Sequence, residues 1–172
     1  MKLESGGTQI VMHPEHAEIE NMTLPQLAER LEDLDGRRTP VGWVPEDAVE
    51  RATVERCILA LVAADETHGA KPMACNMEVK LRSKEQLVNA RVTGIGEGGI
   101  RIEAPSKWVV GTHVEMQVKA GESDELGLRV RGIIREIHGN QLRISVAEQP
   151  SEGHERRLRR FVVELIRHRS GS

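Results

Sequence analysis

The spacing of hydrophobic residues changes from helical to alternating near residue 70. Before that point, apolar residues recur three and four positions apart, which is typical of amphipathic helices. The first predicted helix begins at Thr23, which forms a capping box with Gln26 and has Pro25 in its first turn. A second helix is predicted from Pro45 to about Thr67. Its apolar stripe comprises Val54, Cys57, Ile58, Leu61 and Val62.

Beyond residue 70, apolar and polar residues alternate in short segments separated by turn sequences. Six such segments predict six strands, arranged as an antiparallel barrel or sandwich. They are Met77–Leu81, Leu87–Val92, Ile100–Ile102, Val114–Val118, Leu126–Ile137 and Leu142–Val146. A final helix is predicted from Glu152 to His168, with an apolar face that can close one end of a barrel. The expected core positions of the strands include Ile100, Ile102, Val114, Met116 and Ile144.

These patterns divide the chain into three parts. Residues 1–22 are expected to be a flexible lead, residues 23–70 an acidic helical segment, and residues 71–172 a β-module with its closing helix. The formal net charge of -3 hides an asymmetry, because residues 1–70 contain 6 Lys and Arg against 14 Asp and Glu, and the remainder 18 against 13. The two parts are therefore expected to meet each other or to meet different partners.

Composition narrows the classes of function. Only Trp43, Trp108 and Phe161 are aromatic, so sites that stack bases or sugars on rings are scarce. Cys57 and Cys75 cannot make a disulfide framework, which favours a reduced setting. No stretch approaches the roughly 20 apolar residues of a membrane-spanning helix, and no secretory signal is visible. We therefore expect a cytoplasmic protein.

The sequence shows no constellation typical of catalysis or of metal binding. It has no Ser–His–Asp order, no nucleophile elbow and no obvious pair of catalytic carboxylates, so we do not expect an enzyme. His13 and His16 flank Glu15, but no further ligand is spaced to complete a zinc site. We therefore expect no bound metal.

Two stretches resemble a PilZ domain: Ala90–Ile102, which contains a glycine-rich turn, and Gly111–Val118. The likeness extends through the hairpin Leu128–Val146 and the last helix, so that it covers about residues 75 to 168. PilZ domains are bacterial six-stranded antiparallel β-barrels that typically bind cyclic di-GMP. The resemblance implies such a barrel, closed by the C-terminal helix, in cyclic di-GMP signalling. It also implies a role in the control of motility, pili or virulence.

PilZ receptors bind their ligand through an Arg-x-x-x-Arg segment before the first strand and an [Asp/Asn]-x-Ser-x-x-Gly turn after the second. Aligned on its last glycine, the turn here is Gly94-Ile95-Gly96-Glu97-Gly98-Gly99, and residues 66–76 contain no arginine. We therefore expect a degenerate site, no cofactor, and a non-catalytic signalling adaptor that acts through protein contacts. The alternative is a cyclic di-GMP receptor with displaced ligand residues. The candidate ligand residues are Lys84, Arg91, Gly94, Gly96, Gly99 and Arg101.

Two surfaces are candidates for association with a protein partner or a second copy of the chain. The apolar stripe of the second helix is more than a small barrel needs, and exposed apolar surface of this kind marks interfaces. The arginine-rich last helix offers a basic face. Nucleic acid is the alternative partner of this face, although net acidity and few aromatic residues disfavour it. The candidate partner residues are Val54, Ile58, Leu61, Val62, Arg156 and Arg160.

Overall fold

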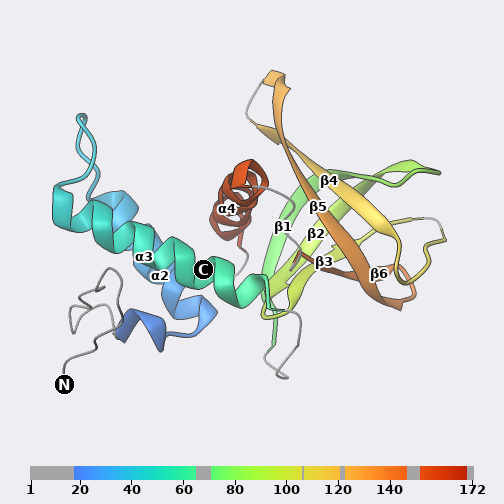
Figure 1. The fold of residues 1–172 in the computed structure, drawn as a ribbon, viewed down its shortest axis with the longest axis horizontal. Coiled ribbons are helices and arrows are strands. Elements are labelled where there is room, and N and C mark those ends of the chain that lie inside the picture. Colours follow the sequence, from blue (N-terminus) through green and yellow to red (C-terminus); the bar gives the residue numbers. More distant parts are fainter. Residues whose placement is uncertain (1–17, 65–70, 106, 121–122, 147–151, 170–172) are drawn as a thin grey trace, which may run out of the picture. The chain divides into compact units, whose positions relative to one another are not determined.

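The computed structural model describes residues 18–64, 71–105, 107–120, 123–146 and 152–169 (Figure 1). The chain forms two compact units, residues 1–57 and residues 58–172. The division falls within the helix α3 (Pro45–Val62), so the last turn of this helix belongs to the same unit as the strands. The flexible lead expected for residues 1–22 lies largely outside the described residues.

The first unit is built on α2 (Leu24–Gly36) and most of α3. The predicted capping box is present, because Thr23 Oγ1 accepts a hydrogen bond from the Gln26 amide and Gln26 Oε1 accepts one from the Thr23 amide. These bonds satisfy amide groups that the helix itself leaves without partners. The buried face of α2 consists of Leu24, Leu27, Ala28, Leu31 and Leu34.

Ion pairs connect α2 to α3 within this unit. Arg30 Nη2 lies 2.5 Å from Glu50 Oε1, and Arg51 Nε donates to Asp35 Oδ1 at 2.8 Å. The guanidinium of Arg51 also lies over the ring of Trp43, 4.7 Å from its centroid. Because Glu50 is buried, its pairing with Arg30 offsets the cost of removing the carboxylate from water.

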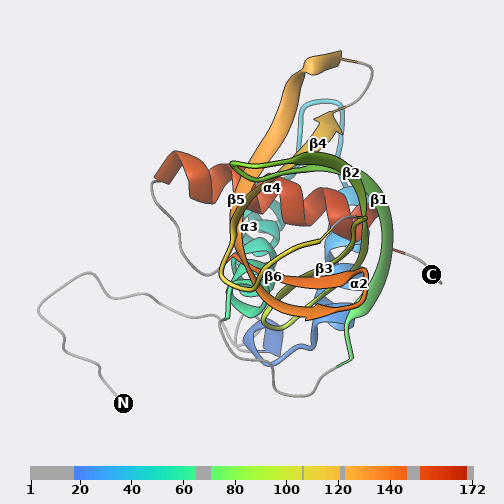
Figure 2. The ribbon, with the colours of Figure 1, turned by 90° about the vertical axis from the view of Figure 1, so that its right-hand side faces the viewer.

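The second unit contains a closed six-stranded antiparallel barrel, seen almost end-on in Figure 2. Around the barrel the strands follow the order β1-β2-β3-β6-β5-β4. The strands are β1 (Met73–Arg82), β2 (Leu87–Gly96), β3 (Gly99–Glu103), β4 (His113–Ala120), β5 (Ser123–His138) and β6 (Gln141–Ser145). Closure pairs every strand on both sides, which removes exposed sheet edges.

The helix α4 (Glu152–Arg167) lies across one end of the barrel and contacts β5, β1 and β2 (Figures 1 and 2). Two hydrogen bonds donated by backbone amides hold its ends: the Asn76 amide donates to the His168 carbonyl at 3.0 Å, and the Arg131 amide donates to the side-chain Nε2 of His154 at 2.9 Å. Its apolar face is buried, as the sequence pattern predicts. The buried residues of this face are Leu158, Phe161, Val162, Leu165 and Ile166.

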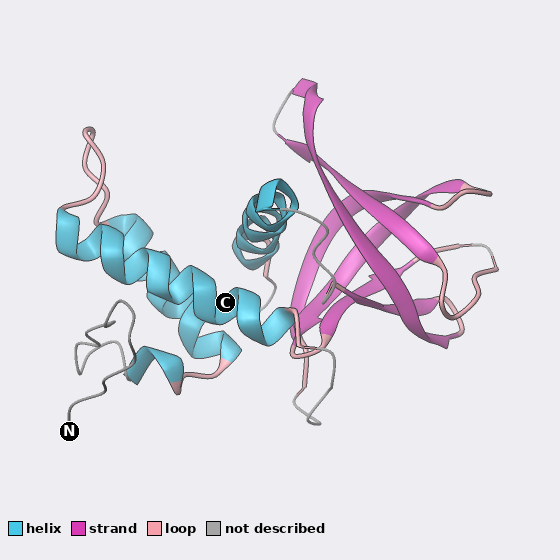
Figure 3. Ribbon diagram, in the orientation of Figure 1, coloured by secondary structure: helices cyan, strands magenta, loops and turns pink. Residues whose placement is uncertain are grey.

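The predicted six-stranded barrel with its closing helix is confirmed (Figure 3). The five core positions predicted for β3, β4 and β6 are each at most 4% exposed. The prediction that the second helix extends to about Thr67 is wrong, because α3 ends at Val62. At this end the Leu61 carbonyl accepts from the Ala64 amide in a tightened last turn and from the Gly98 amide of the barrel.

Three of the four residues expected to form the exposed apolar stripe of α3 are buried. Val54, Ile58 and Val62 are 0%, 1% and 0% exposed, and Leu61 is half-buried. The expectation that this stripe is exposed for a partner is therefore wrong for the three buried residues. An apolar side chain that is already removed from water leaves little area for a further interface to bury.

Candidate functional site

The turn between β2 and β3 is made of glycines with unusual backbone geometry. β2 ends at Gly96 and β3 begins at Gly99, and these two residues lie opposite each other. Gly98 and Gly99 have φ values of 86° and 131°, a region that favours glycine. A Cβ atom on Gly99 would also overlap the carbonyl oxygen of Ile144 on β6. Gly99 therefore permits both the turn and the close approach of β6.

The chain itself occupies both backbone polar groups of Gly98. The Gly98 amide donates to the carbonyl of Leu61, at the end of α3, at 3.2 Å. Its carbonyl accepts from Arg143 Nη1 on β6 at 2.9 Å. The Arg143 guanidinium is further held by Glu136, whose Oε2 lies 3.4 Å from Arg143 Nε. The turn is thus held by α3 on one side and by β6 on the other.

Pro72, just before β1, lies against the two earlier glycines of the turn. A Cβ atom added to Gly94 would come within 3.2 Å of Pro72 Cβ, and one added to Gly96 within 3.2 Å of Pro72 Cα. Such distances are shorter than ordinary van der Waals contact, so a side chain at either position requires a small shift of the proline or of the strand. The space in which larger polar side chains would stand is therefore partly filled by the chain.

The structure brings together only part of the predicted ligand set. Arg101 on β3 lies opposite Gly94 and joins the three glycines at the turn. Arg91 lies farther along β2, where its guanidinium is 3.9 Å from the Glu78 carboxylate. Lys84 lies in the β1–β2 turn, at the other end of β2. The prediction that Lys84 lies near the glycine turn is therefore wrong. In an antiparallel sheet, the β1–β2 turn and the β2–β3 turn lie at opposite ends of β2.

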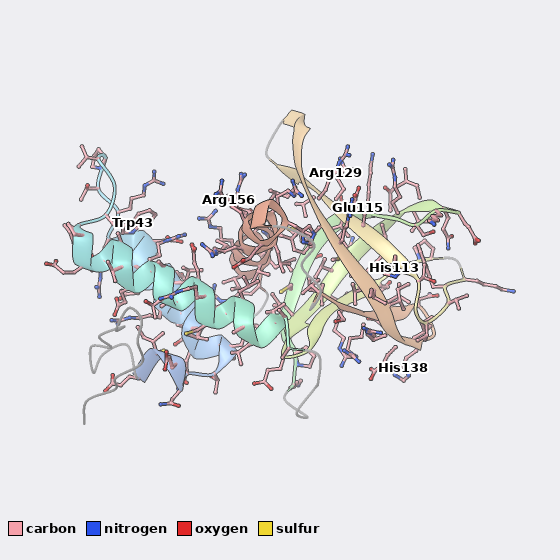
Figure 4. All side chains as sticks on the ribbon, viewed as in Figure 1. Trp43, His113, Glu115, Arg129, His138 and Arg156 are labelled. Carbon is pink, nitrogen blue, oxygen red and sulfur yellow. The ribbon has the colours of Figure 1, made fainter. Side chains whose placement is uncertain are left out.

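Sequence reasoning did not predict that Leu61, Pro72 and Arg143 contact the glycine turn. Arg143 follows the turn by 45 positions, and only the pairing of β6 with β3 brings it near. For Pro72 a signal existed, since two glycines two positions apart in a strand indicate close approach of another backbone. Arg156 and Arg160, in contrast, are exposed on α4, as the basic face requires (Figure 4, which labels Arg156).

The sequence matches the family model of the PilZ domain over residues 66–164, which is more than half of the chain. The chain belongs to the PilZ family. No curated protein matches it. PilZ domains are generally non-catalytic binding domains of cyclic di-GMP signalling. The match covers the glycine turn, so the departures from the ligand motif at Gly94 and Gly96 lie within the PilZ domain itself.

The described residues of this PilZ protein offer little for nucleophilic catalysis or metal binding. Burial raises the pKa of the Cys75 thiol to about 11, so the thiol is protonated at neutral pH and is a poor nucleophile. The described residues contain no group of three or more His, Cys, Asp or Glu side chains that could hold a metal ion. The segment from His13 to His16 lies outside them. Within the described part of the chain, each helix is too short or too polar to cross a membrane.

Proposed function

We propose that this protein is a non-catalytic PilZ adaptor whose cyclic di-GMP site is degenerate and which acts through protein contacts. The observation that carries the proposal is the hydrogen bond from the Gly98 amide to the Leu61 carbonyl. It places the end of α3 at the turn that a PilZ receptor uses for its ligand. A nucleotide that bound through the Gly98 amide would have to break this hydrogen bond.

The charges around the turn also argue against binding of a dinucleotide with two phosphates. Arginine pairs recognise phosphates and guanine edges through bidentate hydrogen bonds, which a single lysine cannot reproduce. Before β1, Lys71 is the cation nearest to the turn in the sequence, and no arginine lies between residues 66 and 76. Arg143, which is close to the turn, is already engaged by Gly98 and Glu136.

The test is a calorimetric titration of the full chain with cyclic di-GMP, beside a PilZ receptor with both motifs as positive control. We expect no heat of binding from this protein at low micromolar concentrations. The double variant Gly94→Asp/Gly96→Ser should also give none, because the arginine pair is still missing and Pro72 crowds both positions. A dissociation constant near 1 μM, about -8.2 kcal/mol, for the unmodified chain would contradict the proposal.

A further inference from the structure

A polar pocket of about 590 Å³ lies on the barrel, away from the glycine turn. Its volume is within the range of about 300–1,000 Å³ that is common for ligand sites. Most ligand pockets are largely apolar, whereas this one is lined mainly by charged and amide side chains. They include Glu78, Lys80, Asn89, Arg91, Glu103 and Gln117. The lining therefore suits a charged, hydrogen-bonding segment and not an apolar cofactor.

The register of the strands gives the pocket one side that carries cations and amides. Lys80 on β1 lies opposite Asn89 on β2 and Gln117 on β4, and Gln117 lies opposite Arg129 on β5. This row across four strands thus contains two cations and two amides, with no carboxylate. Arg91, in contrast, has carboxylates opposite it on both sides, from Glu78 and Glu103. Lys80 is therefore the cation in the pocket that lacks a carboxylate directly across the sheet.

The next row, two residues farther along each strand, combines an apolar side chain with further cations. Leu87 on β2 is 51% exposed and lies opposite Arg82 on β1. Arg82 in turn lies opposite Glu115 on β4, and Glu115 lies opposite Arg131 on β5. The single carboxylate of this row has an arginine on each side. Leu87 follows the β1–β2 turn, which a hydrogen bond from Gln86 Nε2 to the Lys107 carbonyl joins to the β3–β4 loop at 3.0 Å.

This loop adds apolar area at the same end of the barrel. Val109 is 70% exposed and Val110 56% exposed. Residues two apart on a strand face the same side at a spacing of about 7 Å, and an extended peptide presents its own side chains at the same spacing. An acidic side chain at Lys80 and an apolar side chain two positions along at Leu87 would match both rows.

We propose that the outer face of β1 and β2 binds an extended segment of a partner protein that carries an acidic residue and, two positions away, an apolar residue. The proposal rests on the adaptor function and names the surface that performs it. Glu78, Glu103 and Glu115 at and beside this face disfavour a nucleic acid, since phosphates would meet three carboxylates. The peptide places its charge on Lys80 instead, whose partners directly across the sheet, Asn89 and Gln117, are amides.

The experiment is selection of a random peptide library, displayed on phage between glycine spacers, on the immobilised full chain. Three variants serve as parallel targets: Lys80→Glu and Leu87→Asn within the face, and Arg160→Glu on α4 as the matched charge reversal elsewhere. All three side chains are exposed, so the variants should fold, and circular dichroism checks this. A mixed-sequence oligonucleotide is titrated into the same proteins.

We expect enrichment of peptides with an acidic residue two positions from an apolar one. Their binding should weaken by at least about tenfold on Lys80→Glu and on Leu87→Asn, which is the loss of one good contact, and stay unchanged on Arg160→Glu. No enrichment, peptides without this pair, or peptides that bind Lys80→Glu as well as the unmodified chain would overturn the proposal. Oligonucleotide binding that depends on Lys80 would overturn it as well.

Failure of this surface and failure of the adaptor function give different results. Peptides that are lost on Arg160→Glu and kept on Lys80→Glu would move the partner to the basic face of α4 and leave the adaptor function standing. Heat from cyclic di-GMP in the same preparation would remove the adaptor proposal itself, whichever peptides are selected.

Discussion

Replacing Gly99 by alanine should destabilise the barrel more than any ordinary glycine-to-alanine change. The residue has a φ of 131°, and a side chain in such a region costs about 1–3 kcal/mol. The added Cβ would also overlap the Ile144 carbonyl oxygen, so β6 must move away from β3. Weakening a backbone contact of this ladder adds about 1–3 kcal/mol. The combined decrease in the free energy of unfolding is therefore about 2–6 kcal/mol.

Gly111→Ala is the matched control. Gly111 has a φ of 93°, but an added Cβ has nothing within 4 Å, so this variant carries the backbone term alone. Urea denaturation followed by far-ultraviolet circular dichroism measures both variants against the unmodified chain. If Gly99→Ala does not fold at all while Gly111→Ala folds, the prediction is also met. Equal costs for the two variants would refute the close approach of β6 to the turn.

Three further predictions concern the core, the α4 contact and the helical unit. Ile102→Ala should lower the free energy of unfolding by about 2–5 kcal/mol, because Ile102 is fully buried, and a cost below about 0.5 kcal/mol in urea would place it outside the core. Burial and two neighbouring arginines lower the pKa of His154 from 6.5, so the unfolded chain binds its proton first as the pH falls. The free energy of unfolding should therefore decrease as the pH drops below about 6.5, and it should decrease less steeply with pH in His154→Gln. Identical slopes in the two proteins would mean that the imidazole is not buried as an acceptor for the Arg131 amide. Glu50→Gln should lower the free energy of unfolding by about 1 kcal/mol, because it removes the charged partner of the half-exposed Arg30. An unchanged melting temperature would show that this ion pair does not stabilise the protein.

Much of the fold follows from local sequence patterns. Alternation places Ile102 in the core, and the threonine cap with Pro25 marks the start of α2, because both signals depend only on neighbouring residues. The end of α3 could not be found in this way. It is fixed by the Leu61 carbonyl, which accepts from Gly98 more than 30 positions later, and such a contact leaves no periodic trace in the sequence.

The sequence alone predicts which ligand-binding side chains the candidate site lacks. It does not predict which residues of the chain contact the turn. The glycines at positions 94 and 96 show directly that the acidic and serine side chains of the PilZ motif are missing. That Pro72 lies against them, and that Arg143 binds the turn, depends on how the barrel closes. The apolar stripe of α3 misled the sequence interpretation, because hydrophobic periodicity shows which face is apolar and does not show what covers it.

The amide of Gly98 offers the most direct test of the claim that the chain itself occupies the glycine turn. In nuclear magnetic resonance spectra of the labelled protein, its hydrogen exchange is measured before and after addition of cyclic di-GMP. A hydrogen bond to the Leu61 carbonyl predicts slow exchange and no shift of the Gly98 signal when the nucleotide is added. Exchange as fast as that of an open turn, together with a shift on addition of cyclic di-GMP, would contradict this account.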